Sequence, residues 1–312
     1  MTAHPVNAAT VSQTIAQADQ AFQAGEADKA LQQISSLPQS GSGSAEALIL
    51  ACRIHYALQQ WDKAVGECEK ATRLDNQNFE YHMWLGRALG LQAEHVSFLS
   101  AYGLGKRVLA EFETAARLNP RSAEALMDLG EFYKAAPGLI GGGLDKAERV
   151  AKQLDSVEPS RAHQLRARIA ESRSDFRTAE QEYKEAVATA PHPALRWTVL
   201  ASFYRTRKRN TDMDAALRSA ENSARKDPRA TIALYDGAGV LIDGKLDPAN
   251  AARLLEEYLA SSTKTEEGPA FEAHVRLAKM KKRLGDSEGA QQQIAAALKL
   301  AHDYKPALEF NR

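Results

Sequence analysis

Apolar residues recur at intervals of three and four along most of the chain, which is the spacing of side chains that share one face of an α-helix. In three segments a leucine directly precedes a small residue, and a bulky residue follows that small residue by three positions. These triplets are Leu85, Gly86 and Leu89; Leu129, Gly130 and Tyr133; and Leu200, Ala201 and Tyr204. No stretch alternates apolar and polar residues over the length of a strand. We therefore predict an all-α fold.

A second pattern links small residues across longer distances. The segment RLGDSEGAQQQIAAALKLA places Gly285, Ala290, Ala297 and Leu300 at intervals of five, seven and three. The same intervals recur at Gln59, Ala64, Ala71 and Leu74, and again at Ser174, Ala179, Ala186 and Thr189. This spacing resembles that of the tetratricopeptide repeat (TPR), a unit of about 34 residues in which two helices touch at small side chains. The resemblance implies a right-handed superhelical solenoid of antiparallel helix pairs.

Prolines mark the predicted ends of second helices, because Pro120, Pro159 and Pro228 cannot continue a helix. With these marks we place units at residues 11–44, 45–78, 79–122, 123–159, 160–193, 194–229, 230–268 and 269–302. The chain, residues 1–312, is then a single TPR-like solenoid of about eight helical hairpins. Insertions near 92–107 and 136–143 interrupt it. We expect the first to lengthen the helices of its unit or add a turn, and the second to form an irregular connection.

The unit WLGRALGLQAEHVSFLSAYGLGK, followed by LMDLGEFYKAAPGLIGGG, resembles a subgroup of bacterial TPR proteins, often exported and without assigned activity. It is also distantly similar to eukaryotic regulators of microtubule dynamics. Neither resemblance supplies a catalytic residue.

Stacked helical hairpins expose the first helix of each unit on one wall, which is suited to holding a peptide or a partner helix. By register, the residues of this wall that we expect to face outward are Arg53, Tyr56, Met83, Trp84, Arg87, Met127, Asp128, Glu131, Lys134, Arg168, Thr198, Arg205, Tyr235 and Asp236. Aromatic and arginine side chains dominate the energy of protein interfaces. The plain alternative is that these side chains are only solvated, or are covered by the ends of the chain.

Some members of the TPR family bind a C-terminal carboxylate through Lys and Asn at fixed first-helix positions. The corresponding positions here hold Ile49 and Arg53, Met83 and Arg87, and Met127 and Glu131, so this clamp is absent. Arg53 and Arg87 are left as the side chains able to meet a partner's carboxylate.

These observations predict a non-catalytic TPR scaffold that binds a peptide or helix of a partner protein in its groove. The alternative is a structural or self-assembling repeat protein whose end units mediate homo-oligomerisation.

Composition narrows the classes of partner. The 312 residues are 44% apolar and 26% charged, and 40 basic side chains balance 40 acidic ones. A chain with no net positive charge is a poor ligand for nucleic acid. The run at Arg205, Arg207, Lys208 and Arg209 is basic, and so is the run at Lys279, Lys281, Lys282 and Arg283. An acidic partner or membrane surface is one reading of these runs, and solvated helix faces are the favoured one.

Cys52 and Cys68 fall at a small position of the first helix and a core position of the second helix of one unit. We expect buried free thiols that behave as small apolar groups, with a disulfide as the less favoured alternative.

The sequence contains no motif for catalysis, metal or cofactor binding. The histidines form no HExxH pair, and Gly103, Gly105 and Lys106 lack the pattern of a phosphate loop. Gly141–Gly143 lack the strand that a dinucleotide site needs. We therefore expect no cofactor and no enzyme activity.

No stretch is long and apolar enough to predict a transmembrane segment. Met1 to Val11 lack the features of a secretory signal. The chain as given therefore indicates a cytoplasmic protein, or an exported or periplasmic one from which a signal peptide has been removed.

Overall fold

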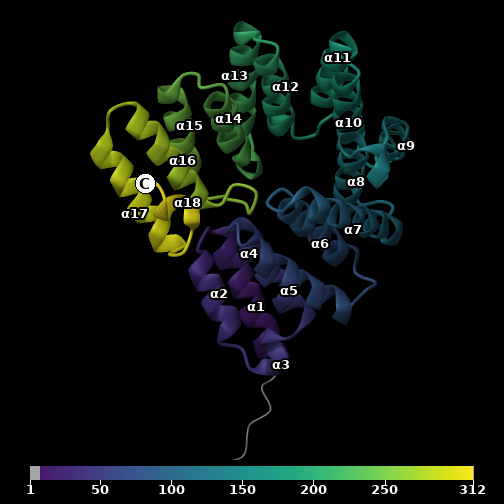
Figure 1. The fold of residues 1–312 in the computed structure, drawn as a ribbon. Helices are drawn as coiled ribbons and strands as arrows, with labels where there is room; N and C mark the ends of the chain where they lie inside the picture. The colour runs from purple at the N-terminus through teal and green to yellow at the C-terminus, as the bar shows by residue number, and fades with distance from the viewer. Residues whose placement is uncertain (1–7, 312) are drawn as a thin grey trace, which may run out of the picture. The chain divides into compact units, whose positions relative to one another are not determined.

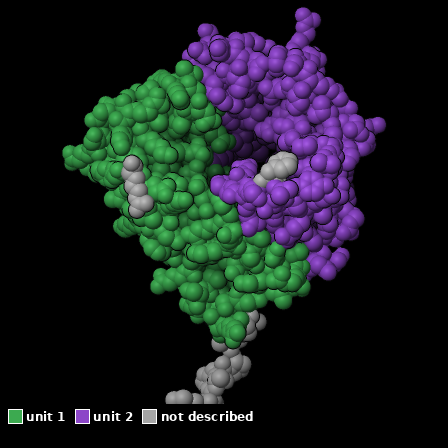
Figure 2. Space-filling model, in the orientation of Figure 1, with its two compact units in different colours: residues 1–74, 234–312 green, residues 75–233 purple. Residues whose placement is uncertain are grey.

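The computed structural model describes residues 8–311, in which every regular element is a helix and no strand occurs (Figure 1). The helices divide into two compact units (Figure 2). Unit 1 comprises residues 1–74 and 234–312, and unit 2 comprises residues 75–233. Unit 1 contains α1 (Ala8–Gln23), α2 (Ala27–Ser35), α3 (Gln39–Ser42), α4 (Ala45–Ala57), α5 (Trp61–Leu74), most of α14 (Ile232–Asp243), α15 (Pro248–Ala260), α16 (Ala270–Arg283), α17 (Ser287–Leu300) and α18 (Lys305–Leu308).

Unit 2 contains two short 3-10 turns, η1 (Gly138–Ile140) and η2 (Pro228–Ala230), in addition to its longer helices. These helices are α6 (Phe79–Ala93), α7 (Phe98–Leu118), α8 (Ala123–Ala135), α9 (Leu144–Leu154), α10 (Pro159–Ser172), α11 (Phe176–Ala188), α12 (Ala194–Thr206) and α13 (Asn210–Lys226). Consecutive helices pack in pairs: α1 with α2, α4 with α5, α6 with α7, α8 with α9, α10 with α11, α12 with α13, and α16 with α17. The predicted all-α class with packed helix pairs is confirmed.

The turn inside several hairpins explains the recurring first position of the sequence pattern. Gly25, Gln59, Ser174 and Gly285 have φ values of 87°, 60°, 60° and 84°, and Lys208 has 58°. This left-handed conformation reverses the chain between the two helices of a pair, and glycine adopts it most easily. Many helices then start at a side-chain cap. Ser44 accepts a hydrogen bond from the backbone of Ala47, and Asp286 accepts one from Gly289.

Small residues stand where helices pack closely. A Cβ atom at Gly86 of α6 would lie 2.5 Å from the ring of Phe112 on α7, its partner in the pair. One at Gly130 of α8 would overlap Leu165 of α10, a helix of the next pair. A larger side chain at either position would force the helices apart.

The two insertions of the sequence touch each other. The first extends α7 to 21 residues. The second forms η1 and a left-handed turn at Gly141, whose carbonyl accepts a hydrogen bond from Lys146. Ile140 packs over Gly105 of α7, and Gly141 lies against Leu109. The division of the chain into eight repeat units stays a prediction.

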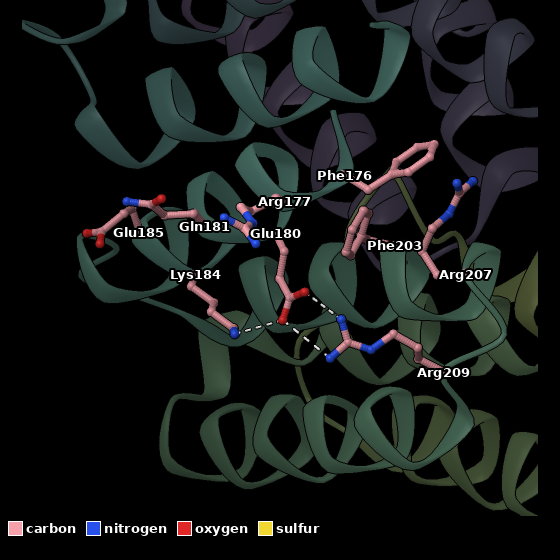
Figure 3. Close-up of a pocket in the computed structure, with 9 residues that line it drawn as sticks. All are labelled: Phe176, Arg177, Glu180, Gln181, Lys184, Glu185, Phe203, Arg207 and Arg209. Atoms are coloured by element: carbon pink, nitrogen blue, oxygen red, sulfur yellow. Dashed lines mark hydrogen bonds and ion pairs between the residues drawn. The ribbon is translucent and has the colours of Figure 1, made fainter. Parts of the chain in front are cut away.

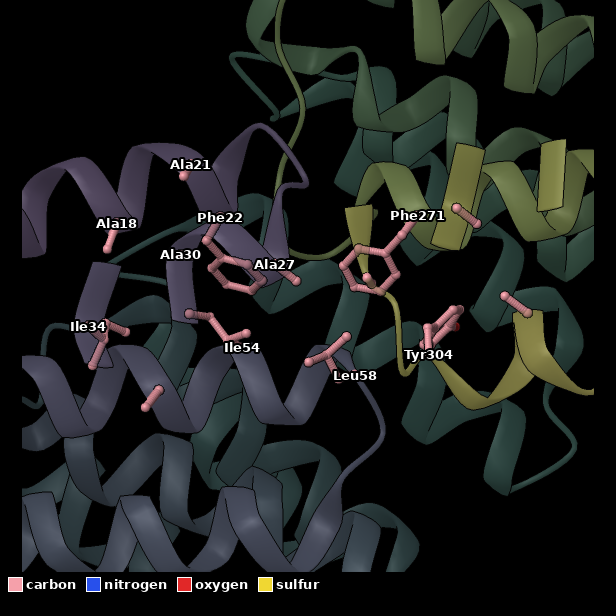
Figure 4. Packing of buried hydrophobic residues seen from close by; sticks show 14 of the residues in the cluster. Ala18, Ala21, Phe22, Ala27, Ala30, Ile34, Ile54, Leu58, Phe271 and Tyr304 are labelled. Carbon is pink, nitrogen blue, oxygen red and sulfur yellow. The ribbon is translucent and has the colours of Figure 1, made fainter. Parts of the chain in front are cut away.

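One hydrophobic core in unit 1 joins both ends of the chain (Figure 4). Phe22, Ile54 and Leu58, from α1 and α4, lie in the same cluster as Phe271 of α16 and Tyr304, and all are at most 1% exposed. The rings of Phe271 and Tyr304 meet edge to face, with centroids 4.9 Å apart. The first and last hairpins therefore cover each other's apolar faces.

Polar contacts surround this core. Gln60 donates a hydrogen bond to Asp303 over 2.6 Å, and His302 lies 2.9 Å from Asp28. Of the apolar residues near the C-terminus, Phe310 packs against the cluster, whereas Leu308 is about half exposed.

Cys52 and Cys68 form a disulfide, with Cα atoms 5.3 Å apart. The expectation of free thiols is wrong. Both residues lie in the interface between α4 and α5, which brings their Cα atoms within the distance that a disulfide requires.

We expect reduction of this disulfide to lower the free energy of unfolding by about 3 kcal/mol, because it releases a loop with a sequence separation of 16 residues. Urea denaturation with and without reductant measures the change, and the Cys52→Ala/Cys68→Ala variant serves as a reductant-insensitive control. Equal midpoints for the oxidised and reduced chains would contradict the prediction.

Gly25 and Gly285 form a matched pair for testing the contact between the chain ends. Their backbones are alike, but a Cβ at Gly25 would lie 2.6 Å from the Cβ of Ala270, whereas one at Gly285 meets nothing within 4 Å. Both Gly→Ala variants should carry backbone strain of about 1–2 kcal/mol. Gly25→Ala alone should lose about 1–3 kcal/mol more from the clash with α16. Chemical denaturation compares them, and equal losses would argue against this contact.

Candidate functional site

The first helices of the pairs in unit 2, α6, α8, α10 and α12, carry most of the residues predicted for the groove. We call the side chains at Trp84, Arg87, Glu124, Asp128, Glu131, Lys134, Glu158, Arg161, Gln164, Arg168, Arg196 and Arg205 the first-helix surface. Of the remaining predicted residues, Arg53, Tyr56, Tyr235 and Asp236 belong to unit 1.

Four predicted groove residues are buried. Met83, Met127, Thr198 and Tyr235 are 3%, 7%, 3% and 2% exposed. The expectation that they face outward is wrong. Each of these residues stands three positions before the small residue of its helix. Met83 of α6, for example, lies in one buried cluster with Ala125 of α8, the first helix of the following pair. This position faces a neighbouring helix, so helical register alone does not predict exposure.

Arg87 links α6 to α8. Its guanidinium lies 4.8 Å from the ring of Trp84, and it forms ion pairs with Asp128 at 2.7 Å and Glu124 at 2.8 Å. Burial alone would lower the pKa of Arg87, but the two carboxylates outweigh burial and raise it. Burial raises the pKa of Asp128, although Arg87 opposes that shift. Two carboxylates of the protein's own chain therefore already hold the Arg87 guanidinium through Nε and one terminal nitrogen.

Two carboxylates of the first-helix surface are each shared by two cations. Glu131 pairs with Lys134 at 3.0 Å and with Arg168 at 2.8 Å. Glu158 pairs with Arg161 at 3.0 Å and with Arg196 at 3.2 Å. Burial lowers the pKa of Arg196, and repulsion from Arg161 adds to this shift. The α8 to α12 part of the surface thus has more cations than carboxylates to neutralise them.

Three buried polar atoms of this surface have no hydrogen-bond partner among the described residues. Oε1 of Glu131 on α8 still forms an ion pair with Arg168, and the other two are Oε1 of Gln164 on α10 and Nε of Arg205 on α12. Gln164 is 7% exposed. A buried polar atom without a partner costs about 1–3 kcal/mol. Because these atoms are buried, a ligand reaches Gln164 or Arg205 only when the side chain turns outward, and the contact then recovers part of that cost.

In unit 1, Arg53 is also engaged. It pairs with Glu266 at 2.8 Å and with Asp19 at 3.1 Å, so two carboxylates of its own chain already hold its guanidinium. Tyr56 packs edge to face against Trp61, with ring centroids 6.3 Å apart.

Tyr235 and Asp236 lie beside Arg276 of α16. The guanidinium of Arg276 stands 4.2 Å from the Tyr235 ring centroid. Burial raises the pKa of Asp236 to about 6, even though Arg276 works in the opposite direction. At neutral pH the charged form of the Asp236 carboxylate therefore destabilises the folded protein.

A pocket of about 640 Å³ lies between α11, α12 and the start of α13 (Figure 3). Phe176, Arg177, Glu180, Gln181, Lys184, Glu185, Phe203, Arg207 and Arg209 line it. Glu180 lies between Lys184 at 2.7 Å and Arg209 at 2.5 Å. The hydrogen bond from Arg209 is the main reason that the pKa of Glu180 falls to about 2.

Sequence reasoning did not find this pocket. Its signals were the aromatic residue at position 176 and the basic run at 205–209, which lie on different hairpins. The left-handed turn at Lys208 turns the end of that run toward α11.

No family model and no curated protein matches the chain. Among solved structures, the TPR protein TTC0263 of Thermus thermophilus aligns with a TM-score of 0.52 and 22% identity, over 62% of this chain and 98% of that one. This chain has a tetratricopeptide-repeat fold. MamA aligns with a TM-score of 0.44 and 21% identity, over 55% of this chain and 93% of its own. A chain of the APC/C hetero-tetramer Cut9–Hcn1 aligns at 0.42 and 17%, over 88% and 50%.

The TPR resemblance predicted from the small-residue spacing is thus confirmed at the level of fold. At these identities the likeness shows the fold alone. None of the TPR helices within residues 8–311 combines the length and apolar character that a membrane span requires.

Asp28, His302 and Asp303 are the group whose side chains come nearest to a metal site, with potential ligand atoms within 4.8 Å of one another. Asp28 already accepts hydrogen bonds from the backbone and the ring of His302. These bonds connect the first TPR hairpin to the last, and they account for the cluster without an ion.

We expect Asp236→Asn to stabilise the protein by about 2–3 kcal/mol at pH 8 and by much less at pH 4. The folded pKa of about 6 lies above the ordinary value of 3.8, so the carboxylate is destabilising above pH 6, and this penalty disappears as it is protonated. Denaturation of wild type and variant at both pH values measures the effect. Asp243→Asn, on the exposed end of the same helix, is the matched control, and a gain independent of pH would contradict the prediction.

Proposed function

We propose that this protein is a non-catalytic scaffold that holds a peptide or helix of a partner protein on the first-helix surface of unit 2. The TPR fold is that of a protein-interaction repeat scaffold. The observation that carries the proposal is the surface between α8 and α12, which combines shared carboxylates with the unpartnered buried atoms of Gln164 and Arg205.

The chemistry of this surface favours a ligand with exposed backbone or carboxylate groups. A backbone N–H of the ligand would donate to Oε1 of Gln164, and a carbonyl or carboxylate would accept from Nε of Arg205. The ring of Trp84 adds a partly exposed aromatic contact at the α6 end of the surface. Met83 and Met127 are buried beneath this surface, so we do not propose them as contacts with the ligand.

The self-assembling alternative receives less support. It requires end hairpins with free apolar faces, but the first and last hairpins pack against each other in unit 1. Light scattering over a concentration series tests this alternative directly.

We expect Arg205→Ala to reduce capture of a bound partner by about tenfold or more, because it removes a hydrogen bond from a charged donor. The variant should fold normally, since Nε of Arg205 has no partner in the described chain. The measurement is quantitative pull-down with the purified chain from a lysate of its own source, followed by a binding titration with the partner identified.

Arg218→Ala is the control, because Arg218 is an exposed residue of the second helix α13 with the same charge. A folded Arg205→Ala variant that retains full affinity would remove the first-helix surface from the proposal.

A further inference from the structure

The pocket between α11 and α12 holds two arginines, Arg177 and Arg207, without a salt bridge among the described residues, although the charge of Arg177 helps to lower the pKa of the nearby Asp175. Arg209 and Lys184 are occupied by Glu180. In contrast, neither Arg177 nor Arg207 forms an ion pair within residues 8–311. Four cations and two carboxylates line the pocket, so it is net positive although the whole chain is neutral.

The arginine at position 207 is held in a fixed place. Its guanidinium stacks on the ring of Phe176, 4.0 Å from the centroid. A stacked guanidinium keeps its N–H groups directed outward in the plane of the fork, which suits bidentate binding of a carboxylate. Less conformational entropy is lost on binding when the side chain is already ordered.

The pocket also offers apolar surface beside these charges. Phe176 is 37% exposed, so its ring is partly accessible to a ligand. Phe203 is fixed from behind by the rings of Tyr183 and Tyr204, at centroid distances of 5.3 and 5.7 Å. Phe203 itself is buried, so a side chain that entered here would meet the ring of Phe176 (Figure 3).

The mixture of charges favours a peptide over a nucleic acid. A polyphosphate chain gains affinity from an extended track of cations, whereas Glu180 and Glu185 interrupt the cations here. A short segment with two carboxylates and one apolar side chain matches the two arginines and the exposed ring of Phe176.

We propose that this pocket is a second binding site, separate from the first-helix surface, for an acidic peptide segment that carries an aromatic side chain. Its carboxylates pair with Arg177 and Arg207, and its aromatic side chain packs against Phe176. This site is formed by the second helix α11, by Phe203 of α12 and by the turn between α12 and α13, and it contains no residue of the first-helix surface, so it does not depend on the proposed function of that surface.

The test is fluorescence anisotropy with a labelled hexapeptide of five glutamates and one phenylalanine. Wild type should bind it, and the Arg177→Glu/Arg207→Glu variant should bind at least about tenfold more weakly. Arg218→Glu introduces the same type of charge change outside the pocket and should stay within about twofold of wild type. Circular dichroism and thermal melting confirm that each variant is folded.

Three outcomes would overturn the proposal. They are equal affinity of wild type and the folded double variant, equal affinity for a peptide with glutamine in place of each glutamate, and much tighter binding of an oligothymidylate of the same charge. The last outcome would assign the pocket to phosphates. Because Arg205→Ala leaves this pocket intact, failure here and failure of the first-helix surface are distinguishable.

Discussion

The structure depends most on the hydrophobic core that the first and last hairpins share in unit 1. Phe22 and Phe271 are separated by most of the chain, yet both are fully buried in one cluster with Tyr304. Closing so long a loop costs conformational entropy, but that cost grows only with the logarithm of loop length. Burial of several large side chains, each worth about 1.5–3 kcal/mol, offsets it. In a repeat protein whose hairpins contact only their neighbours, end units would need polar caps, and here each end covers the other.

The two units use their charged residues differently. In unit 1, the charged residues Arg53 and Glu266 are paired with each other, and Asp28 holds His302. In unit 2, ion pairs connect successive first helices, from Arg87 through Asp128 and from Arg168 through Glu131. Such pairs order the surface before a ligand arrives, and the atoms they leave unsatisfied, on Gln164 and Arg205, are the basis of the proposed recognition.

Much of the fold could be predicted from the sequence because it follows local rules. The left-handed turns at Gln59, Ser174 and Gly285, and the small residue at Gly86, recur at fixed intervals that any reader of the chain can find. The candidate site was harder to predict from the sequence, because the exposure of a side chain such as Met83 or Thr198 depends on the neighbouring hairpin and not only on the helix that carries it. The disulfide, the packing of Phe22 with Phe271, and the pocket at Phe176 all join segments whose separation a helical pattern does not encode. The positions of Cys52 and Cys68 within one unit left the disulfide as the less favoured alternative. No signal in the sequence marked the packing of Phe22 with Phe271, and the pocket required two hairpins to be considered together.

The central claim is that the two ends of the chain form one cooperative core, and hydrogen exchange tests it most directly. Phe271→Ala removes a buried ring from α16, and a loss of this kind costs about 3–5 kcal/mol. The account predicts faster amide exchange in α1 and α2 as well as in α16 and α17, because the core they share is weakened as a whole. Leu200→Ala, which opens a cavity in unit 2, should leave α1 and α2 unchanged. Faster exchange in Phe271→Ala confined to α16 and α17, with α1 and α2 as protected as in wild type, would contradict the account.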